Sequence, residues 1–458
     1  MDGTGGGGAG PAAGPPASPA LELDLYEVTM AAAYHAEGLA DVPASFSLFV
    51  RNLPPSTSFL VAAGLEDALA FLESFCFGPG DLAALDGLGL FDDAFLEMLA
   101  AVRFSGAVRA IPEGRVALAN EPLLEVDATL ATGQLVETAL LAMVGHQTAL
   151  ATRAARLRLA AADRSVADFG LRSTPWGAAG MRLARAARIA GMDSTSNVAA
   201  AGAYGLPVSG TMAHSYVQAH EDEASAFESF AERFGSHAVL LVDTYDTDRG
   251  LAHAVEVARR MRQRGVELAG VRIDSGDLAA GARRARRVLD EAGFGQLKVF
   301  LTGGLDEFQI EELVAAGTPV DGFGVGAALA NPGPALEAAY KLVEVGGRPV
   351  RKRSPGKVSW PGRKQVWRLP SGADVLTLAE EDRPASDAEP LLAEVMAVGR
   401  RTAAGRQDVA AAADRFRADL GWLPGPARRI RHPEPPQVQV GGGLRRLAQR
   451  LDADPSGR

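Results

Sequence analysis

Between residues 160 and 330, short apolar runs alternate with segments that are rich in Ala, Arg and Glu and have the period of a helix. Runs such as residues 238–242 and 298–301 do not alternate with polar positions in the way a half-exposed strand does. Unbroken runs of this kind are typical of strands buried on both faces of a parallel sheet. The later runs recur about every 20 to 30 residues, the length of a strand plus a crossover helix. We therefore predict an α/β fold in which residues 141–340 form an irregular parallel β/α barrel.

Small or polar residues follow each of these apolar runs. In β/α barrels the functional residues collect at the carboxyl ends of the strands, so these tips are the expected place for chemistry. The tips begin at Asp168, Met192, Gly210, Val242, Arg272, Leu301 and Gly324.

The segments on either side of the predicted barrel have a different pattern. Residues 20–140 mix short alternating strands with Ala- and Leu-rich helices, and residues 341–380, within the C-terminal segment 341–434, carry several turn signals and basic residues. Together they predict a flanking α+β accessory domain built from the N- and C-terminal segments. Residues 1–19 are Gly-, Ala- and Pro-rich, which predicts a disordered tail. Residues 435–458 are interpreted as a flexible tail, and we expect both tails to be dispensable.

Composition narrows the class of protein. The chain has 458 residues and a net charge of −10, which argues against nucleic acid as the main partner because phosphate neutralisation needs a basic face. Its single cysteine, Cys76, cannot form an intramolecular disulfide and suits a reducing cytoplasm. No stretch approaches the roughly 18 unbroken apolar residues of a membrane span. These features predict a cytoplasmic protein of enzyme size that does not enter a membrane.

Two consecutive tips contain glycines that suit a bound phosphate. Gly303 and Gly304 follow one predicted strand, and Gly324 and Gly326 end the next. Glycine lets backbone N–H groups approach an anion, and the dipole of the following helix favours negative charge. The alternative is a pair of tight turns, but two consecutive tips of this kind favour a phosphate site.

Charged residues occupy the tip before these glycines. Asp274 and Asp277 are three residues apart, a spacing that can grip vicinal hydroxyls or hold Mg²⁺ through water. A helix cap is the alternative interpretation, above all for Asp277. Arg272 lies two residues before Asp274, on the same face of the strand. A cation and an acid at one strand end suit a ligand that has both an anionic group and hydroxyls.

Histidine and lysine are scarce in the chain, so their positions are informative. His214, one of seven histidines, lies in the stretch GTMAHSY, between an apolar run and a helical segment. The alternative for a single histidine is a capping or core role. Only five of the 46 basic residues are lysines, and four of these lie between residues 341 and 364. Lysines concentrated in this way favour contact with phosphate groups, although a solvated basic loop has the same pattern.

In combination, these motifs run in the same order as those of a known family. They are DLYEVTM (residues 24–30), FVRNLP (49–54), GLE (64–66), QTALATRAAR (147–156), DFGLR (168–172), DSTSN (193–197), GTMAHS (210–215), VDTYD (242–246), RIDSGD (272–277), YKLV (340–343), KVSWPG (357–362) and KQVWR (364–368). The chain thereby resembles the nicotinate phosphoribosyltransferases, which are type II phosphoribosyltransferases. GTMAHS, VDTYD and RIDSGD together are highly specific for this family.

The resemblance implies a reaction in NAD salvage. Nicotinate would displace pyrophosphate from phosphoribosyl pyrophosphate to form nicotinate mononucleotide, with coupled hydrolysis of ATP in the presence of Mg²⁺. It also implies that ATP phosphorylates His214, and that Asp243 supports the charge on that imidazole. No dedicated metal-ligand set is predicted.

Further site residues follow from the resemblance. Tyr26 would stack on the nicotinate ring, reaching across the interface of a homodimer with shared active sites. Arg272 and Thr211 would fix nicotinate or the neighbouring phosphoribosyl group, and Asp274 the ribose hydroxyls. Arg172 would contact the diphosphate. The remaining predicted phosphate contacts are Gly303, Gly304, Gly324 and Gly326 for the 5′-phosphate, with Lys357, Ser359 and Lys364 on the basic segment.

The chain departs from the family pattern at a few positions. Ser173 replaces a usual second arginine, Arg153 a lysine and Ser359 a threonine, and the residue before Gln147 is not the expected asparagine. Ser173 removes a cation near the predicted diphosphate site.

Two alternatives to this function stay open. One is a related transferase that acts on nicotinamide or on quinolinate. Nicotinamide lacks the negative charge that Arg272 would pair with, and quinolinate should demand more binding cations than the sequence places at the site. The other is a non-catalytic, phosphosugar-binding barrel. A protein of that kind is expected to have lost at least one of His214, Asp243, Arg272 and Asp274, and all four are present.

Overall fold

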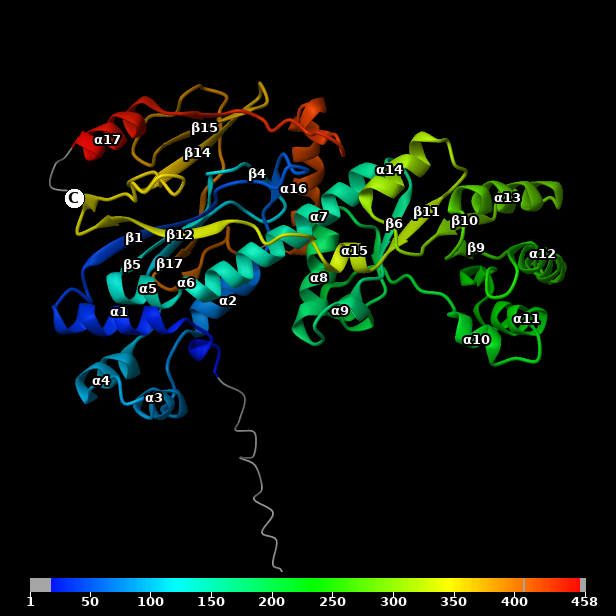
Figure 1. Cartoon of the computed structure of the whole chain (residues 1–458), viewed down its shortest axis with the longest axis horizontal. Coiled ribbons are helices and arrows are strands. Elements are labelled where there is room, and N and C mark those ends of the chain that lie inside the picture. The colour runs from blue at the N-terminus through cyan, green and yellow to red at the C-terminus, as the bar shows by residue number, and fades with distance from the viewer. Residues whose placement is uncertain (1–17, 407, 454–458) are drawn as a thin grey trace, which may run out of the picture.

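The computed structural model describes residues 18–406 and 408–453, which form two unequal lobes (Figure 1). Helix α7 (His146–Ala161) lies between the lobes. The smaller lobe holds a parallel sheet in the order β7-β6-β11-β10-β9-β8. Its strands are β6 (Ser165–Asp168), β7 (Ser194–Thr195), β8 (Val239–Leu241), β9 (Gly270–Ile273), β10 (Lys298–Leu301) and β11 (Gly322–Val325). The predicted parallel α/β architecture is therefore confirmed.

A closed ring of strands is not confirmed, because β7 and β8 form the two edges of this sheet. The chain between them makes a single parallel bridge, from Val208 to Thr195 of β7. On the other side, the hydroxyl of Thr211 donates a hydrogen bond to the carbonyl of Val239 in β8. Pro207, next to this bridge, lacks a backbone N–H and so cannot donate a hydrogen bond to a neighbouring strand. On the β8 side, the Thr211 side chain therefore makes the contact that backbone hydrogen bonds would make in a closed barrel.

The polar tips predicted from the sequence lie together at the carboxyl edge of the sheet. Asp168 and Thr195 are the last residues of β6 and β7. Asp274 and Thr302 directly follow β9 and β10, and Asp243 lies two residues beyond β8. Because all six strands are parallel, their ends bring residues that are far apart in sequence to one edge.

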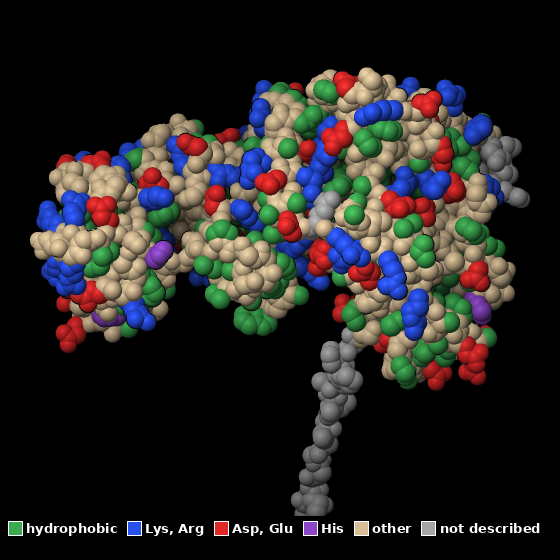
Figure 2. Space-filling model, turned by 180° about the vertical axis from the view of Figure 1, so that it is seen from behind, with side chains coloured by type: hydrophobic (Ala, Val, Ile, Leu, Met, Phe, Trp, Pro, Cys, Tyr) green, Lys and Arg blue, Asp and Glu red, His purple; other side chains and the backbone are tan. Residues whose placement is uncertain are grey.

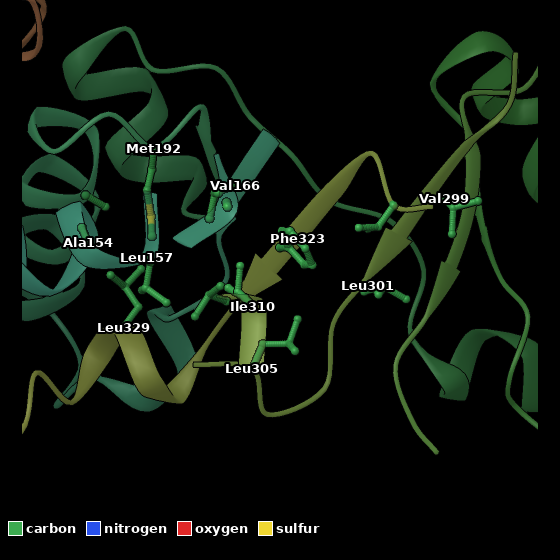
Figure 3. Close-up of a cluster of buried hydrophobic side chains, with 14 of the residues drawn as sticks. Ala154, Leu157, Val166, Met192, Val299, Leu301, Leu305, Ile310, Phe323 and Leu329 are labelled. Atoms are coloured by element: carbon green, nitrogen blue, oxygen red, sulfur yellow. The ribbon is translucent and has the colours of Figure 1, made fainter. Parts of the chain in front are cut away.

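Buried aliphatic and aromatic side chains hold this sheet against its helices (Figure 3). Val166, Val299, Leu301 and Phe323 of the strands are at most 2% exposed, as is Ile310 of α14 (Glu307–Ala315). Burial of one such side chain contributes about 1.5–3 kcal/mol relative to exposure. Helices α8 (Ala178–Ile189), α12 (Thr247–Gln263) and α13 (Leu278–Glu291) also contribute to this core.

The larger lobe is built around a seven-stranded sheet in the order β13-β12-β1-β5-β3-β17-β18. Its strands are β1 (Pro43–Val50), β3 (Ala107–Ala110), β5 (Pro122–Thr129), β12 (Ala338–Val345), β13 (Arg348–Pro349), β17 (Ala393–Ala397) and β18 (Arg400–Arg401). β1 pairs antiparallel with β5 on one side and with β12 on the other. The sheet thus unites segments from before and after the parallel sheet. β12 crosses the predicted domain boundary at residue 340.

Short helices surround the larger sheet. Helix α1 (Leu25–Ala36) packs on α5 (Leu130–Leu135), and α4 (Asp93–Ala101) contributes Phe95 and Leu99 to the second hydrophobic core. No single helix within the described ranges is long and apolar enough to cross a membrane. Helices α2 (Leu65–Ser74) and α3 (Pro79–Asp86) would pass that test only together, and they are bent by 86° relative to each other.

The C-terminal segment is folded, so the predicted flexible tail at residues 435–458 is wrong for residues 435–453. β19 (Val438–Val440) pairs with β15 (Ala373–Leu378) in a sheet that also contains β14 (Lys364–Leu369) and β16 (Glu389–Pro390). Helix α17 (Gly442–Ala453) then buries Leu444, Leu447 and Ala448. Residues 454–458 lie outside the described residues, as do residues 1–17 of the predicted N-terminal tail.

The glycines that suggest a linker start a helix instead. The carboxylate of Glu381 accepts hydrogen bonds from the backbone N–H groups of Gly443 (2.6 Å) and Leu444 (3.3 Å). A Cβ atom at position 443 would lie 2.3 Å from Glu381 Oε1. Glycine therefore allows a carboxylate to cap the helix closely, and the cap satisfies N–H groups that have no partner within the helix.

Truncation of the Leu444 side chain tests whether α17 is part of the folded body. Leu444 is fully buried, so Leu444→Ala is expected to lower the free energy of unfolding by about 2–5 kcal/mol. Gln449→Ala, at an exposed position of the same helix, is the control and should change it by less than about 0.5 kcal/mol. Equal effects of the two variants in denaturant unfolding would contradict a packed α17.

Candidate active site

Asp274 is the centre of the contacts at the carboxyl edge. Its Oδ1 accepts a hydrogen bond from the hydroxyl of Thr302, which directly follows the neighbouring strand β10. Arg272 Nη2 lies 3.8 Å from Oδ1, and His214 Nε2 lies 3.9 Å from Oδ2. The Asp274 side chain is 32% exposed, so a ligand can reach it. Thr302 was not assigned a role from the sequence, although its place before two glycines at a strand tip was a usable signal.

Asp243 does not contact His214, contrary to the sequence-based prediction. Its Oδ2 accepts hydrogen bonds from the backbone N–H of Asp274 (2.9 Å) and from the hydroxyl of Ser275 (2.6 Å). Its Oδ1 is buried and has no hydrogen-bond partner among the described residues. The cause is strand order, because β8 and β9 are neighbours and Asp243 faces the loop after β9. Asp243 therefore fixes the backbone that carries Asp274.

His214 is the first residue of the short helix α10 (His214–Gln218). Its Nδ1 lies 3.1 Å from Thr244 Oγ1, and its Nε2 faces the Asp274 carboxylate. The side chain is 40% exposed. Thr244, in the VDTYD motif, therefore takes the contact that was predicted for Asp243. Both ring nitrogens have an oriented neighbour, and the imidazole remains open to a second reactant.

Arg272 is a largely buried cation with spare hydrogen-bonding capacity. Its side chain is 14% exposed, and Nη1 donates to the carbonyl of Met212 at 3.3 Å. Its Nε is buried without a partner in the described part of the chain. Burial lowers the pKa of Arg272, and the nearby positive charge of Arg172 lowers it further, although Asp274 and Asp243 oppose the shift. A buried guanidinium of this kind is matched to an anionic ligand group.

A small cavity of about 80 Å³ adjoins Arg272. Its lining includes the aromatic rings of Phe169, Phe300 and Phe323 together with Thr211. The predicted substrate residue Thr211 uses its hydroxyl hydrogen to contact Val239, so only its lone pairs remain for a ligand. An apolar wall with one cation at its rim suits a flat aromatic acid.

The glycine tips lie where the sequence places them, and two have a steric reason to be glycine. Gly303 has φ +96°, and a Cβ there would lie 1.8 Å from the carbonyl oxygen of Asp274. At Gly324 a Cβ would lie 2.6 Å from the side chains of Phe169 and Thr302. Gly304 and Gly326 follow at the same two tips.

A cavity of about 440 Å³ borders Gly303, Ser275 and Asp277. Asp277 accepts a hydrogen bond from the N–H of Ala280 at 2.9 Å, so it caps α13, as the alternative interpretation had it. Asp274 is thus the aspartate of this pair whose carboxylate stays directed toward the site residues.

Tyr26 and Arg172 line a second, larger cavity of about 930 Å³. Arg172 lies in a 3-10 turn after β6, and Tyr26 lies in the first turn of α1 on the larger lobe, with 44% of its surface exposed. Asp168 holds the Arg172 loop by accepting hydrogen bonds from Gly170 N (2.8 Å) and Thr195 Oγ1 (2.7 Å). The cavity thus joins the carboxyl edge of the sheet to the larger lobe.

Acidic groups surround Tyr26. Burial raises the pKa of its phenol, and the nearby charges of Glu137 and Glu27 raise it further. Glu27 is fully buried. Its Oε1 accepts hydrogen bonds from the backbone N–H of Thr138 (3.0 Å) and from the Thr138 hydroxyl. Its Oε2 has no hydrogen-bond partner among the described residues. Burial raises the pKa of Glu27 to about 7.

Positions that depart from the family pattern lie beside these elements. Ser173 and His146 both line the larger cavity. Burial lowers the pKa of His146, with a contribution from Arg182. Arg153 forms an ion pair with Glu307, so its charge serves contact between α7 and α14.

Four cations gather on the larger lobe to form what we call the basic cluster: Arg51, Lys341, Lys352 and Lys357. Burial lowers the pKa of Lys341, and the other three charges lower it further. Glu137 opposes this shift, with its Oε1 3.9 Å from Lys341 Nζ. Like charges held together against their repulsion are typical of a site for a multiply charged anion.

Lys364 and Ser359 are not available for direct phosphate contact. Lys364 is 2% exposed; its Nζ lies 2.9 Å from Glu125 Oε1 and donates to the carbonyl of Gly362 at 2.7 Å. Ser359 is also 2% exposed, and its Oγ accepts a hydrogen bond from Lys352 N at 3.0 Å. Both residues fix the chain around the basic cluster. Lys357 is exposed and stays a candidate for phosphate contact.

No group of three or more His, Cys, Asp or Glu side chains within the described residues is placed to hold a metal ion. Mg²⁺ is usually bound through one or two carboxylates together with substrate phosphates. Asp243 Oδ1 and the Asp274 carboxylate are the oxygens at the site that such an ion would meet.

A parallel sheet with glycine turns, paired aspartates and a buried arginine at its carboxyl edge defines an α/β protein that binds a phosphorylated, hydroxyl-bearing ligand. Two family models match the chain: the nicotinate phosphoribosyltransferase N-terminal domain over residues 21–145, and the nicotinate phosphoribosyltransferase family over residues 165–363. The chain belongs to the nicotinate phosphoribosyltransferase family.

Individual relatives agree with this assignment. A nicotinate phosphoribosyltransferase of Mycobacterium tuberculosis is 46% identical over 417 residues, which cover 90% of this chain and 89% of that protein. One from Bacillus subtilis is 44% identical over 359 residues, covering 76% and 73%. The crystal structure of human nicotinic acid phosphoribosyltransferase superposes with a TM-score of 0.84 at 30% identity, covering 94% of this chain and 100% of that chain.

Alanine at the two adjacent glycines tests the close approach at Gly303. Both glycines have positive φ, but a Cβ at Gly304 would have no atom within 4 Å, whereas one at Gly303 would overlap the Asp274 carbonyl. Gly304→Ala is expected to cost about 1 kcal/mol of unfolding free energy from backbone strain alone. Gly303→Ala should cost at least twice as much and should also weaken substrate binding. Equal losses of stability in the two variants would contradict the steric argument.

A pH titration of stability tests the environment of Glu27. The folded state prefers the neutral carboxyl, whose pKa is about 7 against an ordinary value of 4.5. The folded state is therefore destabilised as the pH rises from about 5 to 8, by roughly 1–3 kcal/mol. Glu27→Gln should remove this decline, while Glu37→Gln at the exposed end of α1 should keep it. A decline that persists in Glu27→Gln would assign the titration to another group.

Proposed function

We propose that the protein forms nicotinate mononucleotide and pyrophosphate from nicotinate and phosphoribosyl pyrophosphate, in NAD salvage. The observation that carries the proposal is the grouping of Asp274, Arg272 and the Gly303 turn at one edge of the parallel sheet. In the reaction, the bond from ribose C1 to the pyrophosphate oxygen breaks, and a bond to the pyridine nitrogen forms. No proton has to be removed, because that nitrogen carries none, so positioning and charge clamps supply the catalysis.

Each group at the site has a matching substrate group. Asp274 binds the ribose hydroxyls, and the Gly303 turn together with the Gly324 tip accommodates the 5′-phosphate. Arg272, with its unpartnered Nε, binds the nicotinate carboxylate. Arg172 binds the diphosphate from the larger cavity. The grouping also supports an oxocarbenium-like transition state, because Asp274 is close to the carbon that develops positive charge.

Nicotinate is favoured over the related substrates. Arg272 provides one buried cation, which matches the single carboxylate of nicotinate. Nicotinamide has no carboxylate, and quinolinate has two. A non-catalytic role is disfavoured because His214, Arg272 and Asp274 are present and lie within contact range, and Asp243 fixes their loop.

ATP would act through His214. A P–N bond forms from an unprotonated imidazole nitrogen to the γ-phosphorus, while the P–O bond to ADP breaks; hydrolysis of the phosphohistidine then returns the imidazole. Thr244 and Asp274 orient the ring from its two nitrogens, and the Asp274 carboxylate supports the positive charge that develops on it. The 40% exposure of His214 supports access by a second reactant.

Mg²⁺ is the cofactor that this chemistry requires. It would be held by substrate phosphates with the free Oδ1 of Asp243 or the Asp274 carboxylate, since it prefers oxygen ligands and keeps few protein contacts. When bound, it neutralises charge that develops on the leaving pyrophosphate.

A barrel-like closure of the sheet and a homodimer complete the proposal. Thr211 already bridges the chain to β8, so residues 207–211 would form the missing side of a ring around the cavity near Arg272. Helix α1, which carries Tyr26, and β12, which carries Lys341, lie on the larger lobe, whereas α10 and β9, which carry His214 and Arg272, lie on the smaller one (Figure 1). In a homodimer, Tyr26 of one subunit would stack on nicotinate bound at the sheet of its partner.

Exposed apolar side chains on the segments that follow β6 and β7 support a contact there. Trp176 is 84% exposed, Val198 79% and Val208 65%. On the face that Figure 2 shows, acidic and basic side chains are interspersed. The unpaired state of Cys76 supports the cytoplasm as the compartment.

Labelling with γ-labelled ATP tests the phosphohistidine. Wild-type protein should acquire an acid-labile, base-stable label, and His214→Asn should abolish it and uncouple the reaction from ATP. Thr244→Val should reduce labelling because it removes the partner of Nδ1. Asp243→Asn should instead raise the KM for phosphoribosyl pyrophosphate, because Asp243 acts on the Asp274 loop.

Two outcomes would count against this assignment. Label that survives in His214→Asn would move the site to another residue, with His220 the next candidate along the chain. A loss of label in Asp243→Asn that exceeds the loss in Thr244→Val would restore the sequence-based pairing of Asp243 with His214.

A further inference from the structure

The segment between β13 and β14 carries cations that repel one another. We call residues 350–358 the basic loop; it contains Lys352 and Lys357 of the basic cluster, and Arg351 and Arg353 beside them. The charges of Lys352 and Lys357 act on Lys341 in the same direction, to disfavour its charged form. Without an opposing contact, a loop of this composition would swing into solvent to relieve its repulsion.

The C-terminal end of α17 supplies that opposing contact. Asp452 Oδ2 lies 3.2 Å from Arg351 Nη1, and the backbone carbonyl of Asp452 accepts a hydrogen bond from Arg353 Nη1 at 3.5 Å. Two arginines of the basic loop therefore face the negative end of a helix as well as a carboxylate, an arrangement that electrostatics favours.

Arg351 is held from the other side as well. Its side chain is only 7% exposed, and its guanidinium lies 5.8 Å from the centroid of the Trp360 ring. Its Nε is buried without a partner among the described residues. Ser359 closes the loop through Lys352, since its Oγ accepts from Lys352 N and its own N–H donates to the Lys352 carbonyl. Loss of the Asp452 contact would remove the support that α17 gives to Arg351 and Arg353, and leave the loop held by Trp360 and Ser359 alone.

α17 itself is fixed firmly enough to act as a support. Glu381 caps its first turn, and Leu444 and Leu447 are buried. A Cβ placed at Gly362, just after the basic loop, would lie 3.5 Å from Leu447 Cδ2, so the helix packs on the backbone there.

We propose that α17, through Asp452, positions the basic loop so that the basic cluster can bind the phosphates of the substrate. The inference rests on the proposed function and extends it, because it takes the phosphates of phosphoribosyl pyrophosphate or ATP as the anions that the basic cluster binds. It assigns a role to a helix that lies beyond residues 21–145 and 165–363, the parts of the chain that the family models match. Asp452 is a positioning residue, because it acts through Arg351 and does not touch substrate.

The expected signature is a change in substrate affinity without a change in stability. The Asp452 side chain is 52% exposed, and ion pairs this exposed contribute little to folding. Asp452→Ala should therefore leave the melting temperature nearly unchanged. It should raise the KM for phosphoribosyl pyrophosphate about 3- to 10-fold, with kcat within about twofold of wild type, because the cations are displaced while the residues at the sheet stay in place.

Five variants of the full-length chain, assayed with nicotinate, ATP and Mg²⁺, test the proposal. Asp452→Ala is compared with Asp452→Glu, which keeps the charge and should restore most of the affinity. Lys357→Ala reports on the basic cluster directly, and the double variant Lys357→Ala/Asp452→Ala measures their coupling. Asp414→Ala removes a different exposed Asp–Arg pair, with Arg417 on α16 (Val409–Trp422), and should match wild type in both KM and kcat.

If Asp452 acts through the loop, its effect should shrink in the Lys357→Ala background, so the two changes will be less than additive. A raised KM in Lys357→Ala with a wild-type KM in Asp452→Ala would overturn the positioning role alone. A wild-type KM in Lys357→Ala would instead overturn the phosphate role of that lysine. The melting temperature of Asp452→Ala could instead fall enough to account for its loss of substrate affinity, with no recovery in Asp452→Glu. That result would show that the Asp452 contact only stabilises the fold.

Discussion

Asp243 accepts two hydrogen bonds from the loop after β9, and these bonds decide where the Asp274 carboxylate lies. Asp274 in turn is the shared neighbour of Thr302, Arg272 and His214. The arrangement of these side chains therefore depends on a carboxylate that binds the backbone beside them. The close packing of Gly303 on the Asp274 carbonyl adds a steric constraint to the same backbone. Small displacements there would move the Asp274 carboxylate relative to Thr302, Arg272 and His214.

The two lobes differ in the physical character of the groups that they present. The parallel sheet brings polar residues to one edge through strand order alone, which suits the precise placement of a few groups. The larger lobe collects charge on surface segments, where Lys341 is held near three other cations. An anionic substrate would meet a rigid recognition surface from one lobe and an electrostatic attraction from the other.

The sequence predicts the elements that repeat and misses the contacts that depend on long-range packing. The strand tips at Asp274 and Gly303 follow from the alternation of apolar runs and helices. The partner of Asp243 could not be read in this way, because it depends on which strands are neighbours. Lys364 looks like a free cation in sequence, but strand pairing turns it toward Glu125 in the interior. The three glycines at residues 441–443 have the composition of a linker, and only the packed structure shows that they lead into α17 and that Glu381 caps this helix.

The pairing of β1 with β12 has a consequence for biogenesis. Phe46 and Leu342 are register partners, although about 300 residues of chain separate them. As the polypeptide leaves the ribosome, β1 and β5 emerge long before the strands that complete their sheet. The parallel sheet of the smaller lobe can assemble before β12 is made and pairs with β1, because its strands β6 to β11 are contiguous in sequence. The nascent chain therefore has an unpaired strand edge at β1 through most of its synthesis. Chaperones protect chains in this state from aggregation.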